Sequence, residues 1–206
     1  MELHLSRDNT THTVLLAASG DSASFSDATP LYHIYTPTPL LARETTTVSR
    51  INRSGADALS YKLSTHSSNI RSSAEYNGAV EPFASINWRK SRVTCNSEEL
   101  KIRRGGFLWI DRTFLGQDGL SYTWHKGMQL TLSVAQNGGK IELARYHDSF
   151  FTMKKPWLEI LPEGMHMLDL IVTSWVVAAT RKSSGRGNGA VASATAGASA
   201  AGVISS

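Results

Sequence analysis

The chain has a single cysteine, Cys95, among its 206 residues. This count excludes an internal disulfide framework and any zinc site built from several cysteines. The first ten residues, "MELHLSRDNT", also lack the basic segment and apolar core of a secretory leader. We therefore expect an intracellular, cytoplasmic protein whose thiol stays reduced.

Long apolar runs are scarce as well, and the most apolar one is "MLDLIVTSWVVAATRK", Met167 to Lys182. A membrane-spanning helix needs about 20 apolar residues, whereas this run is shorter and contains Asp169. As a helix over 165–182 it is apolar on nearly every side, so it has to be enclosed by protein. A buried strand is the alternative, because the run is rich in β-branched residues. Pro162 before the run and Arg181 near its end favour the helix, whose carboxyl end attracts cations.

Helical periodicity is absent before residue 164, and alternating apolar and polar residues dominate instead. In "QLTLSVAQNGGKIELARY" the alternation is interrupted at Asn137-Gly138, a pair that tolerates the positive φ of a tight hairpin turn. Gly105-Gly106 predicts a second hairpin, and Gln117–Gly119 predicts a further turn. Six more runs have strand character: "LYHIYT", "RETTTVSRIN", "ALSYKLS", "ASINWR", "SFFTM" and "WLEIL".

These runs predict a mainly β fold, with about 10 to 12 strands forming a closed antiparallel β-barrel around the C-terminal helix. We expect residues 28–182 to form this domain. Residues 1–27 are predicted to be a poorly ordered lead-in that can include one strand. Residues 183–206 consist mostly of Ala, Gly and Ser and are predicted to be a disordered tail.

Positive charge is concentrated in one stretch, although the net charge of the chain is only +4. Between residues 89 and 104 the basic residues are opposed only by Glu98 and Glu99. The candidate anion-binding residues are Arg89, Lys90, Arg92, Lys101, Arg103 and Arg104. Such a cluster attracts an anionic lipid surface by about 1 kcal/mol per residue. It is also consistent with a solvated hairpin whose charges protect a sheet edge.

The residues that could carry chemistry show no established catalytic or metal-binding spacing. Seven histidines are scattered without paired-ligand spacing, and no G-x-S-x-G, P-loop or G-x-G-x-x-G motif occurs. We therefore assign no catalytic residue, no metal and no cofactor. An alternative is a small hydrolase or transferase, in which His33, His125 or His147 meets an acid or a serine at a barrel end.

Three stretches carry a family resemblance: "ASINW" at 84–88, "FLGQDGLSYTW" at 114–124 and "IELARYH" at 141–147. Together with "LDLIVTS" near the end, they resemble a fungal domain-of-unknown-function family of the Tubby C-terminal-like superfamily. The resemblance covers roughly residues 28–182 and implies a closed barrel around a hydrophobic C-terminal helix. It also implies recognition of phosphoinositide headgroups by Lys and Arg on the barrel surface. The ending "AATRKSSG" is less charged than is usual in the family, and the resemblance assigns no catalytic residue.

The resulting hypothesis is a non-catalytic intracellular binding module, peripheral to membranes, that recognises anionic lipid headgroups through the six basic residues. The alternatives are a protein–protein scaffold without a small ligand and the histidine-dependent hydrolase. Nucleic acid is not an expected partner, because basic and exposed aromatic residues are not interleaved. No transmembrane segment is expected, and the sequence does not define an oligomeric state.

Overall fold

A computed structural model describes residues 1–7, 9–17, 29–37, 45–52, 80–105, 111–136, 138–148 and 155–184, with only the backbone of 181–184. The strands within these residues are β1 (Glu2–Leu5), β2 (His12–Ala17), β3 (Thr29–Tyr35), β4 (Thr45–Ile51), β5 (Val80–Asn87), β6 (Arg92–Cys95), β7 (Glu98–Glu99), β8 (Arg103–Gly105), β9 (Asp111–Leu115), β10 (Ser121–Lys126), β11 (Leu130–Gln136), β12 (Gly139–His147) and β13 (Trp157–Ile160). A 3₁₀ helix at Pro162–Met167 leads directly into the α-helix α1 (Leu168–Ser184).

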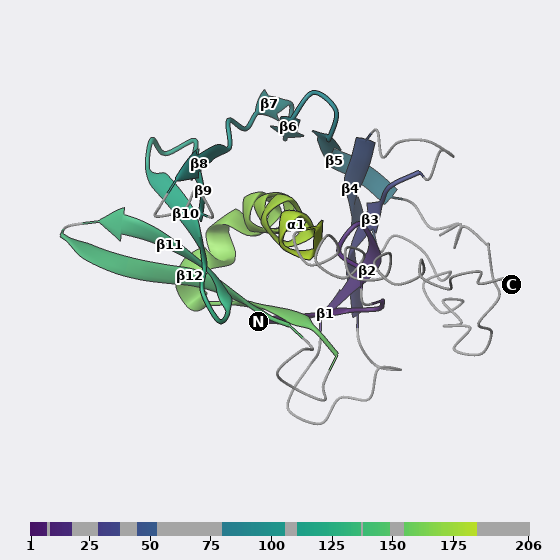
Figure 1. Ribbon diagram of the computed structural model, residues 1–206. Coiled ribbons are helices and arrows are strands. Elements are labelled where there is room, and N and C mark those ends of the chain that lie inside the picture. Colours follow the sequence, from purple (N-terminus) through teal and green to yellow (C-terminus); the bar gives the residue numbers. More distant parts are fainter. Residues whose placement is uncertain are drawn as a thin grey trace, which may run out of the picture.

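The described strands form one antiparallel sheet that curves around α1 (Figure 1). The strand order is β7-β6-β5-β4-β3-β2-β1-β13-β12-β11-β10-β9-β8. Strands that follow one another along the chain are therefore neighbours in the sheet, except for β7 and β8, which lie at its two ends. The pairing of β1 with β13 joins the first strand to the last. A mainly β fold with one C-terminal helix is confirmed.

The amino-terminal strands complete the sheet, contrary to the expectation of a poorly ordered lead-in. Strand β1 pairs with β13, placing Leu3 opposite Leu158, and it pairs with β2 on its other side. The side chains of Leu3 and Leu15 are fully buried in the main core. Residues 2–5 and 12–17 thus form two strands, one more than the sequence suggested, because their apolar side chains contact a core formed mainly by distant residues.

The closed barrel is not confirmed, because β7 and β8 end the strand order and no ladder joins them within the described residues. The chain passes from one end strand to the other through residues 100–102. Leu100 holds this connection to β6, since its N–H donates to the carbonyl of Val93 at 2.8 Å and its side chain is buried. The sheet thus encloses the helix with an opening between β7 and β8.

The predicted hairpins are present as strand pairs. β11 and β12 meet with Gln136 opposite Gly139, and Gly138 has a φ of 74°, as a tight turn requires, whereas Asn137 lies outside the described residues. β8 and β9 pair with Gly105 opposite Asp111. At the third turn, the Leu120 N–H donates to the Asp118 carboxylate at 3.0 Å.

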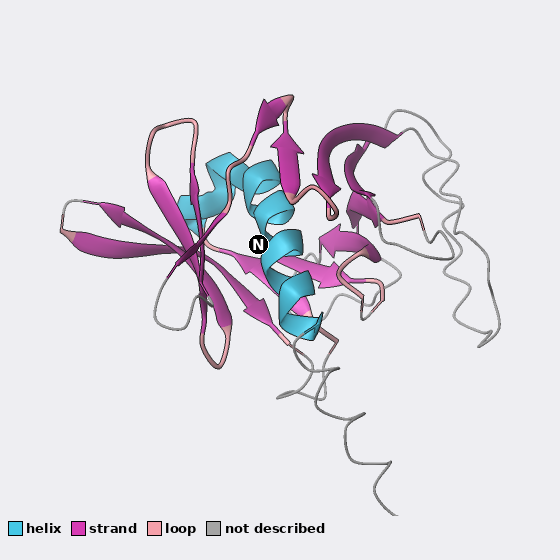
Figure 2. Ribbon diagram, turned by 45° about the horizontal axis from the view of Figure 1, so that its top comes forward, coloured by secondary structure: helices cyan, strands magenta, loops and turns pink. Residues whose placement is uncertain are grey.

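The apolar segment forms α1, so the alternative of a buried strand is wrong. Every residue from 171 to 180 is buried, and the helix runs through the space inside the curved sheet (Figure 2). Two of its buried hydroxyl groups have acceptors within the helix: Thr173 donates to the Asp169 carbonyl at 2.7 Å, and Ser174 donates to the Ile171 carbonyl at 3.1 Å. These bonds explain how polar residues are tolerated in a core helix.

Several sequence-based predictions fall partly or wholly outside the described residues. They are the strands "ALSYKLS" at 58–64 and "SFFTM" at 149–153, the first two residues of "RETTTVSRIN", Gly106 of the second predicted hairpin, and the tail from residue 185 onward. Residues 183 and 184, which we assigned to the tail, belong to α1.

Candidate functional site

The six candidate anion-binding residues are not gathered in one place. Arg89 and Lys90 lie in the turn between β5 and β6, and Arg92 begins β6. All three are exposed, and the Arg92 guanidinium Nε lies 3.6 Å from a carboxylate oxygen of Glu99. These three residues therefore form one basic hairpin.

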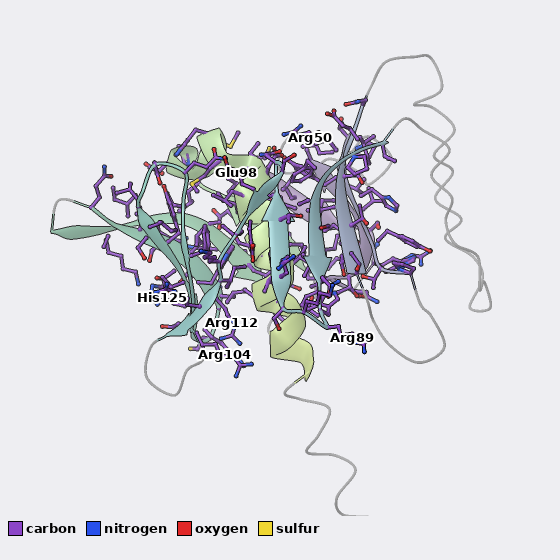
Figure 3. All side chains as sticks on the ribbon, turned by 90° about the horizontal axis from the view of Figure 1, so that it is seen from above. Arg50, Arg89, Glu98, Arg104, Arg112 and His125 are labelled. Carbon is purple, nitrogen blue, oxygen red and sulfur yellow. The ribbon has the colours of Figure 1, made fainter. Side chains whose placement is uncertain are left out.

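Arg103 and Arg104 lie on β8, at the other end of the strand order, and both are exposed. The register of β8 and β9 places Arg104 directly opposite Arg112. In Figure 3, Arg89, Arg104 and Arg112 all lie toward the carboxyl end of α1. We call this region, formed by Arg89, Lys90, Arg92, Arg103 and Arg104, the basic end.

Lys101, the sixth candidate, instead lines a pocket of about 740 Å³ at the amino end of α1. We call it the end pocket. Its walls come from the sheet on one side of the opening, from the β9–β10 turn on the other, and from the 3₁₀ helix and the first turn of α1. Its apolar lining residues are Leu100, Leu115, Met165, Met167, Leu168 and Leu170. Its charged lining residues, apart from His166, are Arg50, Glu98, Glu99, Lys101, Asp118 and Asp169.

One wall of the end pocket is held by an ion pair between β4 and α1. Arg50 donates from Nε to Asp169 Oδ1 at 3.2 Å and from a terminal nitrogen to the other carboxylate oxygen. The Tyr32 hydroxyl donates to the same Asp169 Oδ1 at 3.1 Å. Burial, and then the adjacent Asp169 carboxylate, raises the pKa of Tyr32 well above its ordinary range, so the hydroxyl stays protonated as a donor.

Two carboxylates at the opening have neutral hydrogen-bond donors. Glu98 accepts from Gln117 Nε2 at 2.9 Å, a bond that joins the two sides of the opening. Asp118 accepts from the hydroxyl of Tyr122 and from the N–H of Leu120. Although burial acts in the opposite sense, these hydrogen bonds lower the pKa of Asp118. Asp118 is therefore an anion at neutral pH.

Cys95 also borders the end pocket, but its thiol is buried. Burial raises the pKa of the thiol, and the Thr173 hydroxyl oxygen lies 3.7 Å from the sulfur. A neutral thiol is a poor nucleophile. The structure thus gives Cys95 a packing role.

Of the three candidate histidines, His125 meets both an acid and a serine. Its Nδ1 lies 3.2 Å from Asp111 Oδ2, and its Nε2 lies 3.0 Å from Ser133 Oγ. The N–H of Lys126 donates to the other Asp111 oxygen at 3.2 Å. The carboxylate is positioned to keep the proton on Nδ1, which leaves Nε2 free to accept from the serine hydroxyl.

His147 and His33 have other surroundings. His147 Nε2 lies 2.9 Å from Glu159 on β13, and its ring stacks on Trp157 with the centroids 4.2 Å apart. His33 stacks on Tyr35 at 6.0 Å. His125 and His147 therefore both meet an acid, as the hydrolase alternative requires, and His125 also meets a serine.

Several of the residues that build these sites were not predicted from the sequence. Asp169 was visible as the acidic interruption of the apolar run, and that interruption was the available signal for a buried partner. Nothing in the local sequence identified Arg50 as that partner or Asp111 and Ser133 as neighbours of His125, because these contacts depend on strand order and register.

Neither a metal site of three side chains nor a membrane-spanning helix occurs in the described ranges. Within them, no three His, Cys, Asp or Glu side chains are arranged to hold a metal ion. No helix there is long and apolar enough to cross a membrane.

Comparisons with known proteins give a family but no activity. No curated protein and no solved structure matches the chain. A family model described as a family of unknown function, DUF6593, matches residues 8–183, which include all the strands from β2 onward and nearly all of α1. The chain therefore belongs to the DUF6593 family.

Proposed function

We propose that this protein is a non-catalytic binding module that recognises anionic lipid headgroups through its basic end. The observation that carries the proposal is the Arg104–Arg112 pair on β8 and β9. The pair brings two guanidinium side chains together at an end of the sheet, and a phosphate group suits the planar guanidinium fork.

The surroundings of this pair support the same ligand chemistry. Arg103 is exposed next to Arg104, and Arg89 lies toward the same end of the domain in Figure 3. Each basic residue near an anionic membrane contributes about 1 kcal/mol of attraction. Four or five such residues are enough for reversible binding of a peripheral protein.

The same proposal includes the finer placement suggested by the sequence. We assign the chain to the Tubby C-terminal-like superfamily and to a fungal source, with an intracellular position peripheral to membranes. The antiparallel sheet around a C-terminal helix supports the superfamily placement, and the basic end supports the peripheral position.

Vesicle co-sedimentation tests the proposal. We expect wild-type protein to bind phosphatidylcholine vesicles that contain a phosphoinositide, and not vesicles of phosphatidylcholine alone. Arg103→Glu combined with Arg104→Glu removes about 2 kcal/mol of attraction, which lowers affinity at least 30-fold. The single variants Arg104→Glu and Lys140→Glu are compared as a matched pair. Lys140→Glu is the control, because Lys140 is exposed on the β11–β12 hairpin. The proposal fails if wild type does not bind, or if Lys140→Glu weakens binding as much as Arg104→Glu.

A second candidate function, ester or amide hydrolysis, is favoured by the Asp111–His125–Ser133 arrangement. The order of contacts, carboxylate to Nδ1 and serine to Nε2, is the one that activates a serine nucleophile. Ser133 is only 3% exposed, so a substrate reaches its oxygen only after neighbouring side chains move.

A fluorophosphonate probe separates the two candidates, because it forms a covalent bond with activated serines. Hydrolysis predicts labelling of Ser133 that is lost in Ser133→Ala and reduced in His125→Gln. Absence of labelling of the folded wild-type protein removes this candidate and leaves the binding module.

A further inference from the structure

We propose that the end pocket is a separate binding site for a small organic amine that carries an apolar chain. The site lies at the amino end of α1, whereas the basic end lies toward its carboxyl end (Figure 3). The two sites therefore differ in position and in the sign of charge that they attract.

The apolar part of the proposed ligand follows from the pocket lining. Leu115 is 62% exposed and Met165 is 43% exposed, although both are large apolar side chains. Both border the end pocket together with Leu168 and Leu170 from the first turn of α1. An alkyl chain lying in this pocket removes exposed apolar surface from water, which favours binding.

The cationic part follows from the charges of the lining. Four carboxylates and two cationic side chains border the end pocket, which leaves two negative charges in excess when His166 is neutral. Asp169 is paired with Arg50, and Glu99 is paired with Arg92 from outside the pocket. Of the four carboxylates that line the pocket, the two that form no ion pair with Lys or Arg within the described residues are Glu98 and Asp118.

Glu98 and Asp118 border the pocket from the two sides of the opening, Glu98 on β7 and Asp118 in the β9–β10 turn. Gln117, the residue before Asp118, donates to Glu98 at 2.9 Å. An alkylammonium group has three N–H donors and one positive charge, so it can donate to both carboxylates while its chain lies against Leu115. A carboxylate or phosphate of the same size meets repulsion at this position.

The opening between β7 and β8 provides access. Across it, Gln117 and Glu98 are joined by a side-chain hydrogen bond, and no strand ladder closes it within the described part of the chain. A ligand can replace this bond without disrupting the sheet.

Isothermal titration of the full-length chain with octylammonium, octanoate and butylammonium tests the proposal. We expect octylammonium to bind with one-to-one stoichiometry and octanoate to bind at least tenfold more weakly. Butylammonium should also bind at least tenfold more weakly than octylammonium, because its chain covers less apolar surface.

Charge-neutralising variants locate the site. Glu98→Gln and Asp118→Asn should each weaken octylammonium binding about tenfold, since each removes one charged acceptor of the ammonium. Asn at 118 keeps an oxygen acceptor for the Leu120 N–H, and Glu98 is exposed, so both variants should fold. Glu163→Gln is the matched control, because Glu163 is exposed on the 3₁₀ helix but does not line the pocket.

The proposal is overturned if octylammonium does not bind, if octanoate binds as tightly, or if Glu163→Gln has the same effect as Glu98→Gln. The lipid proposal has a different signature. Arg103→Glu with Arg104→Glu should reduce vesicle binding and leave octylammonium binding unchanged, so either proposal can fail without the other.

Discussion

Arg50 on β4 and Asp169 in the first turn of α1 form an ion pair that joins the sheet to the helix inside it. The guanidinium donates to both carboxylate oxygens and also lies over the Phe83 ring, with Cζ 5.0 Å from the ring centroid. Tyr32, which is opposite Arg50 in the β3–β4 ladder, donates to the same carboxylate. Two neighbouring strands are thereby connected to one helical residue.

We predict that Asp169→Ala lowers the free energy of unfolding by about 2 kcal/mol or more, because the buried Tyr32 hydroxyl and Arg50 both lose their acceptor. A double-mutant cycle of Arg50→Met and Asp169→Ala, measured by urea unfolding, should give a coupling energy of about 1 kcal/mol. This value is modest because the Arg50 side chain is 40% exposed.

The surface ion pair of Arg145 and Glu142 serves as the control for this cycle. Its side chains are 41% and 31% exposed, so Glu142→Gln should change stability by less than about 0.5 kcal/mol. Equal losses for Asp169→Ala and Glu142→Gln would contradict a structural role for the Arg50–Asp169 pair.

The two buried tryptophans should respond differently to replacement by phenylalanine. Trp124 Nε1 donates to Ser174 Oγ at 2.9 Å, whereas Trp175 Nε1 has no partner among the described residues. Both side chains are almost completely buried, so the two substitutions remove similar apolar volume. We expect Trp124→Phe to lower the free energy of unfolding by about 1 kcal/mol more than Trp175→Phe does, because only Trp124→Phe removes a hydrogen bond. Thermal and urea unfolding of the two variants measure this difference, and the reverse order would refute it.

Gly164 should not tolerate a side chain. A Cβ added there would lie 2.6 Å from the carbonyl oxygen of Leu143 and 2.9 Å from Ile171 Cδ1. We predict that Gly164→Ala destabilises the protein by about 1–3 kcal/mol, because the 3₁₀ helix has to move away from β12. Gly127→Ala is the control, since its nearest contact would be an ordinary 3.6 Å. Circular dichroism melts should show a lower midpoint for Gly164→Ala alone.

Stability should fall on mild acidification because of two neighbouring histidines. Burial, and then the charge of His12, lowers the pKa of His33 below 6.5, while burial and Arg7 lower the pKa of His12. As pH falls below about 6.5, the unfolded chain binds protons that the folded chain does not, so the free energy of unfolding decreases. Above that value both states are neutral and the contribution is fully present.

Urea titrations between about pH 7.5 and pH 5 measure the slope of the free energy of unfolding against pH. His33→Gln should flatten it, whereas replacement of the exposed His166 by Gln provides a control for loss of a histidine at the surface. An unchanged slope in His33→Gln would show that other groups cause the acid sensitivity.

Much of the fold was predictable because its signals are local. Alternation and turn residues identified β3, β4, β10, β11 and β12, and the run after Pro162 identified α1. The pairing of β1 with β13 was not predictable, because it joins segments more than 150 residues apart. The "MELHL" segment has no turn signal of its own that indicates this partner.

The sites were less predictable than the fold. The exposure of the basic residues followed from their charge, but their division between the basic end and the end pocket depends on which strands lie at the two ends of the sheet. The contacts of His125 with Asp111 and Ser133 likewise depend on the register of three strands.

By itself, the sequence determined that the chain is mainly β and that its last apolar run must be enclosed, because periodicity and apolar content act over a few residues. Only the tertiary structure decided where the sheet remains open, which residues meet at Asp169, and how charge divides between the two ends of the domain. Those features arise from contacts between segments that are far apart in the sequence, so no short stretch of sequence predicts them.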